Sequence, residues 1–134
     1  MKRIGDQKME KKYDVVALGE LLIDFTDSGV SDQKNPLFEA NPGGAPCNVL
    51  AMLKKLDKEC AFIGKIGNDI FGRMLTDVVK EVGISTEGLV VDPYYNTTLA
   101  IVKTYENGER DFFFFFYPGA DMKLKAGVVY FDLI

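Results

Sequence analysis

The apolar and polar positions in the first two thirds of the chain predict strands that alternate with helices. Residues 13–23 form a nearly continuous apolar run, which is typical of a strand buried on both faces of a parallel sheet. Residues 59–66 and 84–91 form two further runs, and Asp92-Pro93 ends the last of them. A shorter apolar segment, 37–40, is expected to be a strand as well.

Two segments between these runs carry the three- and four-residue spacing of amphipathic helices. The first follows Pro46, a residue that suits the first helical turn because it lacks an N–H that would be unpaired there. Its apolar positions are Val49, Leu50, Met52, Leu53 and Leu56. The second has Phe71, Leu75, Val78, Val79 and Val82. Asp69 is expected to cap the second helix and Gly83 to end it. The order predicts an α/β fold with a parallel sheet covered by helices.

The segment that follows has a different pattern. Residues 97–106 and 109–117 are rich in β-forming residues, and Asn107-Gly108 between them is a strong hairpin signal. A hairpin inserted into a parallel α/β pattern is expected to project from the main sheet.

Phenylalanine occupies five consecutive positions of this hairpin, 112–116. These side chains cannot all be solvated, so some are expected to face a partner chain or a closed ligand. Packing against the strands near Phe25 and Phe38 is the simpler alternative.

Candidate chemistry gathers at residues 41–51, which read Asn-Pro-Gly-Gly-Ala-Pro-Cys-Asn-Val-Leu-Ala. Gly43 and Gly44 allow the backbone to pass close to a ligand, and Asn48 adds an amide donor and acceptor at the start of the helix. Asp24 follows the first buried strand, at the end where open α/β sheets bind ligands. Two plainer interpretations stay open: a tight loop-to-helix junction, and a turn-initiating role for Asp24.

Composition excludes several classes of function. A length of 134 residues, 47% hydrophobic and 27% charged, is typical of one soluble globular domain. The chain has no histidine, which excludes Ser-His-Asp and Cys-His catalysis. No apolar run approaches the roughly 20 residues that span a bilayer. Residues 1–12 are polar and lack a secretory apolar core, so a cytoplasmic location is the default expectation. The net charge of −4 argues against a nucleic-acid surface.

The remaining polar and reactive groups receive structural interpretations. Cys47 and Cys60 lie in apolar surroundings and are interpreted as small core residues, and no metal site is expected. The lysines of the first segment, Lys2, Lys8, Lys11 and Lys12, are interpreted as part of a solvated, mobile end. A dinucleotide site at the glycine pair is disfavoured because the G-x-G-x-x-G spacing is absent.

Three stretches in this order, 17–25, 42–49 and 61–72, resemble the ribokinase-like, phosphofructokinase-B-type carbohydrate kinases, and among them the fructokinases. The hairpin segment 107–112 and the turn 118–121 are similar to that subfamily too. The resemblance implies the N-terminal part of a ribokinase-like fold, in which a parallel sheet flanked by helices carries a protruding antiparallel β lid. It places the lid at about 25–40 and 97–117 of a domain that spans 13–134.

The resemblance also implies a function. Members of this family transfer the γ-phosphoryl of ATP, with Mg²⁺, to a primary hydroxyl of a sugar. The residues that match the family's sugar-binding positions are Asp24, Gly43, Gly44 and Asn48, and the lid excludes water from the sugar. In several members the lid sheets pair into a dimer. Self-association through the lid or through an exposed sheet edge is therefore expected.

Several positions depart from the family pattern. Leu50 stands where a small residue is usual, Asp57 where glycine is usual, and Phe116 where fructokinases carry an arginine. No role is carried onto Phe116, and the sugar stays undetermined. The family's later Gly-Ala-Gly-Asp segment, with the catalytic base and a phosphate cradle, has no counterpart in these residues.

The resemblance therefore leads to two alternatives. In the first, the chain is the sugar-binding and lid portion of a longer fructokinase-like kinase, without the ATP half, without a catalytic residue, and inactive alone. In the second, it is a non-catalytic sugar-binding or assembly module derived from such a kinase.

Overall fold

The structure is a computed structural model that describes residues 11–129 and 131–134. The elements in chain order are β1 (Val15–Leu18), β2 (Leu22–Val30), β3 (Pro36–Gly43), α1 (Ala45–Lys54), β4 (Cys60–Gly67), α2 (Ile70–Val82), β5 (Ser85–Asp92), β6 (Leu99–Thr104), β7 (Arg110–Phe115) and the 3₁₀ turns η1 (Ala120–Lys123), η2 (Ala126–Val128) and η3 (Phe131–Leu133). The α/β class, the two helices and the hairpin predicted from the sequence are confirmed.

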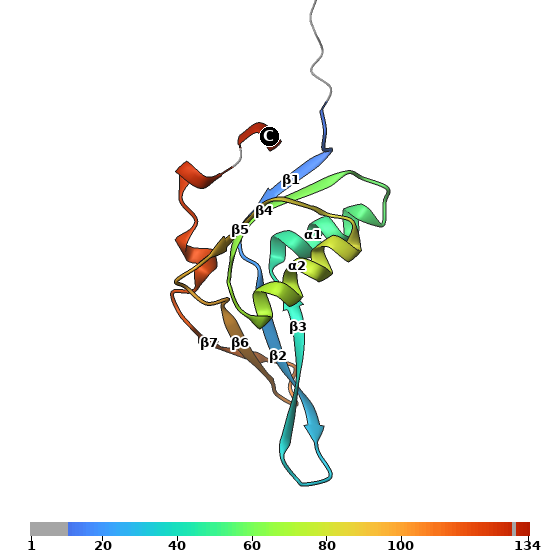
Figure 1. Cartoon of the computed structure of the whole chain (residues 1–134). Coiled ribbons are helices and arrows are strands. Elements are labelled where there is room, and N and C mark those ends of the chain that lie inside the picture. Colours follow the sequence, from blue (N-terminus) through green and yellow to red (C-terminus); the bar gives the residue numbers. More distant parts are fainter. Residues whose placement is uncertain (1–10, 130) are drawn as a thin grey trace, which may run out of the picture.

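The strands form two separate sheets (Figure 1). The first, named the body sheet, has the order β1-β4-β5, and its strands are parallel. The second, named the projecting sheet, has the order β3-β2-β6-β7. Its β2–β3 and β6–β7 pairs are antiparallel, whereas the central pair of β2 and β6 is parallel. The β2–β3 hairpin extends away from the rest of the molecule.

Helices α1 and α2 pack on the body sheet from one side, and η1 contacts β4 from the other (Figure 1). The buried core lies mainly between this sheet and the helices, with Leu21 and Ile23 from the start of β2. Its members from the sheet and helices are Cys47, Leu50, Cys60, Phe62, Ile66, Leu75, Val79 and Ile84. The interpretation of both cysteines as core residues is confirmed.

The single strand predicted over residues 13–23 is wrong. The chain leaves the body sheet after Leu18, turns at Gly19 and Glu20, and enters the projecting sheet at Leu22. β1 is also only half-buried, because it is an edge strand. An apolar run does not distinguish one long strand from two short ones that pair with different partners, since both bury apolar residues.

Helix α1 confirms the predicted helix, but its apolar positions do not form one covered face. Leu50 is completely buried, whereas Val49, Met52 and Leu56 are 58%, 58% and 66% exposed. The three exposed residues follow one another at intervals of three and four, so they form a stripe of their own beside the buried one.

Helix α2 begins and ends as predicted. Asp69 Oδ1 accepts a hydrogen bond of 2.8 Å from Gly72 N, and Gly83 takes the left-handed conformation with φ of 89°. Asp57 also has a positive φ, 56°, so this aspartate adopts at the end of α1 a conformation that favours the glycine usual in the family.

Lys12 of the first segment is exposed, as predicted, but it has a partner in the body. Its Nζ lies 2.6 Å from Glu87 Oε1 of β5, and the neighbouring Tyr13 hydroxyl donates to Ser85 Oγ at 2.9 Å. Lys2 and Lys8 lie outside the described residues.

Candidate functional site

Asp24 lies near the start of β2, where the chain has just left the body sheet. It pairs with Asn41 of β3, so it belongs to the interior of a strand pair, and the alternative of a turn-initiating aspartate is wrong. The expectation that it stands at the carboxyl end of a buried strand is also wrong, because β1 ends six residues earlier at Leu18. Asp24 is half-buried.

Gly43, at the end of β3, lies against the side chain of Asp24. A Cβ at residue 43 would overlap the Oδ2 atom of Asp24 and would approach Leu22 Cδ1 to 3.1 Å. The absence of a side chain at Gly43 therefore leaves the space that the carboxylate occupies. The structure brings these two predicted residues together at the junction of the two sheets.

Gly44 forms the corner between β3 and α1. Its φ is 127°, and a Cβ there would overlap the carbonyl oxygen of Glu20. Glu20 also occupies the helix start, because Ala45 N donates to Glu20 Oε1 at 2.9 Å. A carboxylate thus already neutralises the N-terminus of α1, which disfavours a phosphate at this position.

Asn48 lies on α1, with its backbone N–H bonded to Gly44 O at 3.1 Å. It lines, together with Gly43, a small cavity of about 70 Å³ between α1 and α2. The other lining residues are Leu21, Pro42, Cys47, Ala51, Val78, Val79, Val82 and Ile84. This lining is apolar, so hydroxyl groups would be bound on the Asp24 side of Gly43 and not in this cavity.

The electrostatics of the junction favour an uncharged, hydroxylated ligand. Burial raises the pKa of the Asp24 carboxyl. Burial, with Glu20 nearby, raises the pKa of the Cys47 thiol to about 12, so this cysteine is not a nucleophile at neutral pH. The carboxylates of Asp24 and Glu20 lie next to the backbone of Gly43 and Gly44. Carboxylates accept hydrogen bonds from hydroxyls and repel phosphate oxygens. The residues at this junction therefore do not fit the phosphates of ATP.

The described residues, 11–129 and 131–134, contain no group of three His, Cys, Asp or Glu side chains that could hold a metal ion. Within the same residues, no helix is long and apolar enough to cross a membrane.

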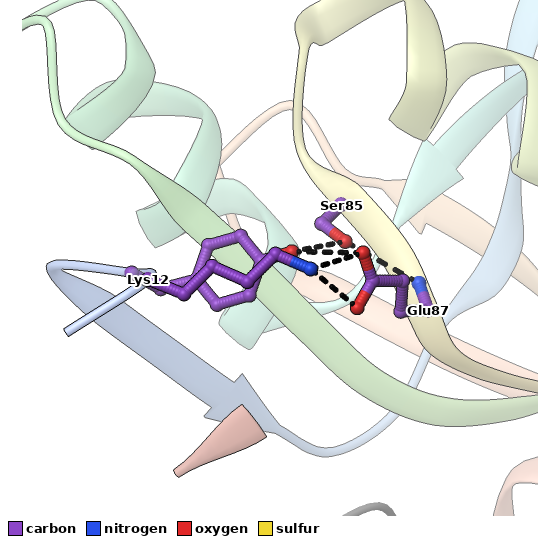
Figure 2. A network of polar contacts seen from close by, with 4 residues as sticks. Lys12, Ser85 and Glu87 are labelled. Atoms are coloured by element: carbon purple, nitrogen blue, oxygen red, sulfur yellow. Dashed lines mark hydrogen bonds and ion pairs between the residues drawn. The ribbon is translucent and has the colours of Figure 1, made fainter. Parts of the chain in front are cut away.

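A larger hollow of about 610 Å³ lies at the amino ends of β4 and β5, far along the strands from Asp24. Figure 2 shows its polar network, in which Lys12 reaches Glu87 beside Ser85. We do not place the functional site there, because open α/β sheets bind ligands beyond the carboxyl ends of their strands. Two of its charged groups, Lys12 and Glu87, also pair with one another.

Sequence reasoning missed two features of this junction. Glu20 was not expected to cap α1, because nothing in the local sequence links it to a helix 25 residues later. Phe25 of β2 packs edge-on against Phe71 of α2, with ring centroids 5.6 Å apart, a contact between the projecting sheet and the body that was not expected. Contacts between residues that lie far apart in the sequence leave no periodic pattern from which they could be predicted.

Comparison with known proteins identifies the family. The model of the pfkB family carbohydrate kinases matches residues 12–132. Fructokinase-2 from Oryza sativa subsp. japonica is 45% identical over 122 residues, which make up 90% of this chain and 36% of the rice protein. The probable chloroplastic fructokinase-6 of Arabidopsis thaliana is 45% identical over 132 residues, or 97% of this chain and 34% of that protein. The chain thus spans about a third of the length of these relatives.

Solved structures give the same answer. The crystal structure of a fructokinase from Xylella fastidiosa superposes with a TM-score of 0.80 at 33% identity, over 88% of this chain and 37% of that one. A structure of the Xylella fastidiosa fructokinase with bound ATP has a TM-score of 0.77 and 34% identity, over 86% and 36% of the two chains. The two-sheet α/β arrangement is therefore that of ribokinase-like sugar kinases. This chain belongs to the pfkB family of carbohydrate kinases.

Proposed function

We propose that this chain is the sugar-binding and lid portion of an ATP-dependent sugar kinase, with fructose as the acceptor that the names of its relatives favour. In the whole enzyme the γ-phosphoryl of ATP passes, with Mg²⁺, to a sugar hydroxyl. The family membership and the relatives named as fructokinases support this class. The observation that carries the proposal is the Asp24 carboxylate held against the bare backbone of Gly43, where the two sheets meet.

The four proposed sugar-binding residues have complementary chemistry. The Asp24 carboxylate accepts hydrogen bonds from two hydroxyls, and Gly43 and Gly44 allow a sugar ring to approach the backbone. Asn48 supplies an amide that both donates and accepts. The projecting sheet is the lid in this proposal, because β2 carries Asp24 directly into it.

The chain alone is expected to be inactive. The junction does not fit ATP phosphates, and no catalytic base is assigned among these residues. A coupled assay of the chain with fructose and ATP is expected to show no turnover. Clear turnover by the 134 residues would contradict the proposal.

The sugar contacts are tested by NMR titration with fructose, because a portion of a site binds weakly. The amide signals of Asp24, Gly43, Gly44 and Asn48 are expected to shift. Gly43→Ala is expected to abolish the shifts, since the added Cβ displaces the Asp24 carboxylate. Gly127→Ala is the matched control, because a Cβ at residue 127 meets nothing within 4 Å. Shifts confined to other residues would contradict the site.

A non-catalytic sugar-binding or assembly module is the second candidate. The observation that favours it is the row of phenylalanines on β7 and directly after it, each about half exposed (50–53% for Phe112 to Phe116). A stand-alone module is expected to release measurable heat when titrated with fructose, whereas the kinase portion is not. Self-association through β7 and a cytoplasmic location belong to either candidate as proposals.

A further inference from the structure

Two adjacent threonines form the root of β6, the point where the chain passes from the body to the projecting sheet. Thr97 is 1% exposed and Thr98 is 4% exposed, although both carry hydroxyls. A buried hydroxyl requires a hydrogen-bond partner. The partners of these two residues come from different parts of the body.

Thr97 is held by Asp69, the N-cap of α2. The Thr97 N–H donates to Asp69 Oδ2 at 2.7 Å, and the Thr97 hydroxyl donates to Asp69 Oδ1 at 2.9 Å. The same hydroxyl accepts from Gly67 N at 3.1 Å, and Asp69 Oδ1 also accepts from Gly72 N at 2.8 Å. The Asp69 carboxylate therefore joins the start of α2 to the root of β6, and the Thr97 hydroxyl links both to the end of β4.

Thr98 is tied to other segments. Its hydroxyl donates to Asp121 of η1, and a Cβ at Gly119 would overlap this hydroxyl. The Thr98 carbonyl accepts from Ile23 N of β2 at 3.1 Å. Both strands that cross from the body into the projecting sheet, β2 and β6, are thus fixed at one point.

We propose that Asp69 is a positioning residue that sets the projecting sheet relative to the body through Thr97. This inference rests on the proposed function, in which that sheet covers the sugar at Asp24. An N-cap needs only one acceptor oxygen. In this chain the second oxygen, Oδ2, accepts a hydrogen bond from the Thr97 N–H at the root of β6. Burial raises the pKa of the Asp69 carboxyl, but the hydrogen bonds from Thr97 and Gly72 outweigh it, so the pKa lies below its ordinary value.

Four variants separate positioning from helix capping. Asp69→Asn keeps an acceptor for Gly72 N but replaces the second oxygen by an amide that cannot accept from the Thr97 N–H. Thr97→Val removes the hydroxyl, and Thr97→Ser restores it. Thr76→Val is the matched control, because the Thr76 hydroxyl donates to Gly72 O within α2.

The measurement is amide hydrogen exchange of the whole chain without sugar, so its outcome does not depend on sugar binding. We expect Asp69→Asn and Thr97→Val to speed exchange in β6 and β7 by about 10-fold or more and to leave residues 60–66 of β4 unchanged. The Gly67 amide is left out of this comparison because it donates to the Thr97 hydroxyl. Thr97→Ser and Thr76→Val are expected to match the unmodified chain in β6 and β7.

Unchanged exchange in β6 and β7 would overturn the proposal. Equal acceleration in every element, or failure of Asp69→Asn to fold, would also overturn it, because Asp69 would then be a general stabilising residue. So would a Thr97→Ser chain that behaves like Thr97→Val. A failed fructose titration, in contrast, would overturn the proposed sugar site and leave this result standing.

Discussion

The body sheet and the projecting sheet are in contact but differ in how they are stabilised. In β4, at the centre of the body sheet, every residue except Lys65 is buried. In β7, at the edge of the projecting sheet, all six residues are exposed. The packing of the body covers the apolar residues of β4, whereas the four phenylalanines of β7 are each about half exposed. We expect the body to supply most of the stability and the projecting sheet to supply the binding surface.

Core truncation tests this comparison most strongly. Phe62 of β4 is completely buried, so Phe62→Ala is expected to lower the free energy of unfolding by about 3–5 kcal/mol. Phe113→Ala in half-exposed β7 is expected to cost less than about 1 kcal/mol. Guanidinium denaturation of both variants measures the two values. Equal losses in the free energy of unfolding would show that the two sheets contribute equally to stability.

The buried ion pair of the body is the second test. Lys65 Nζ lies 2.5 Å from Asp92 Oδ2, and their side chains are 14% and 5% exposed. Asp92→Asn leaves the Lys65 charge uncompensated and is expected to cost about 3 kcal/mol. Glu87→Gln, which removes the exposed pair with Lys12, serves as the control and is expected to change stability little.

The same pair predicts a dependence on pH. The hydrogen bond from Lys65 lowers the pKa of Asp92 to about 2, below its value in the unfolded chain. The stabilisation is therefore complete above the unfolded pKa and is lost as the pH falls through the folded pKa. Unfolding titrations from pH 5 to pH 2 should show a larger loss in the unmodified chain than in Asp92→Asn, because Asp69, whose pKa is also lowered, contributes to the loss in both.

Self-association is expected to depend on the projecting sheet alone. Phe114 stacks on Phe112, with ring centroids 6.4 Å apart, on the edge strand β7. Phe114→Lys is expected to shift the chain toward monomer in sedimentation velocity while changing the free energy of unfolding by less than about 1 kcal/mol. Val30→Lys, at the far end of β2, is the matched exposed control. Association that persists in Phe114→Lys would place the contact on the body instead.

The smallest expected effect on stability is at Asp24, where one substitution should remove sugar binding without destabilising the fold. Because burial raises the pKa of Asp24, its charge opposes folding, and this cost appears as the pH rises through the folded pKa. Asp24→Asn is therefore expected to stabilise the chain at pH 7 by less than about 1 kcal/mol, with no gain near pH 3. The same variant should lose the fructose-induced NMR shifts. A destabilised variant at pH 7 would show that the carboxylate has a structural role.

Much of the candidate site follows from the sequence. The glycine pair, the proline-led helix start and Asp24 are chemically distinctive, and Asp24 and Gly43 lie in contact. Their role in sugar binding stays a prediction. The position of Asp24 inside a strand, and the apolar cavity beside Asn48, could not be predicted, because both depend on how β3 and α2 pack against these residues.

The sequence by itself determined the local elements of this protein. Helix periodicity, the cap at Asp69, the stop at Gly83 and the Asn107-Gly108 hairpin are decided within a few residues of chain. The tertiary structure alone decided that residues 13–23 divide between two sheets, that β2 and β6 pair in parallel, and that Glu20 and Asp69 hold segments 25 and 28 residues away. The physical reason is that strand pairing and buried hydrogen bonds depend on which residues are close in space. The pattern of neighbouring residues in the sequence does not contain that information.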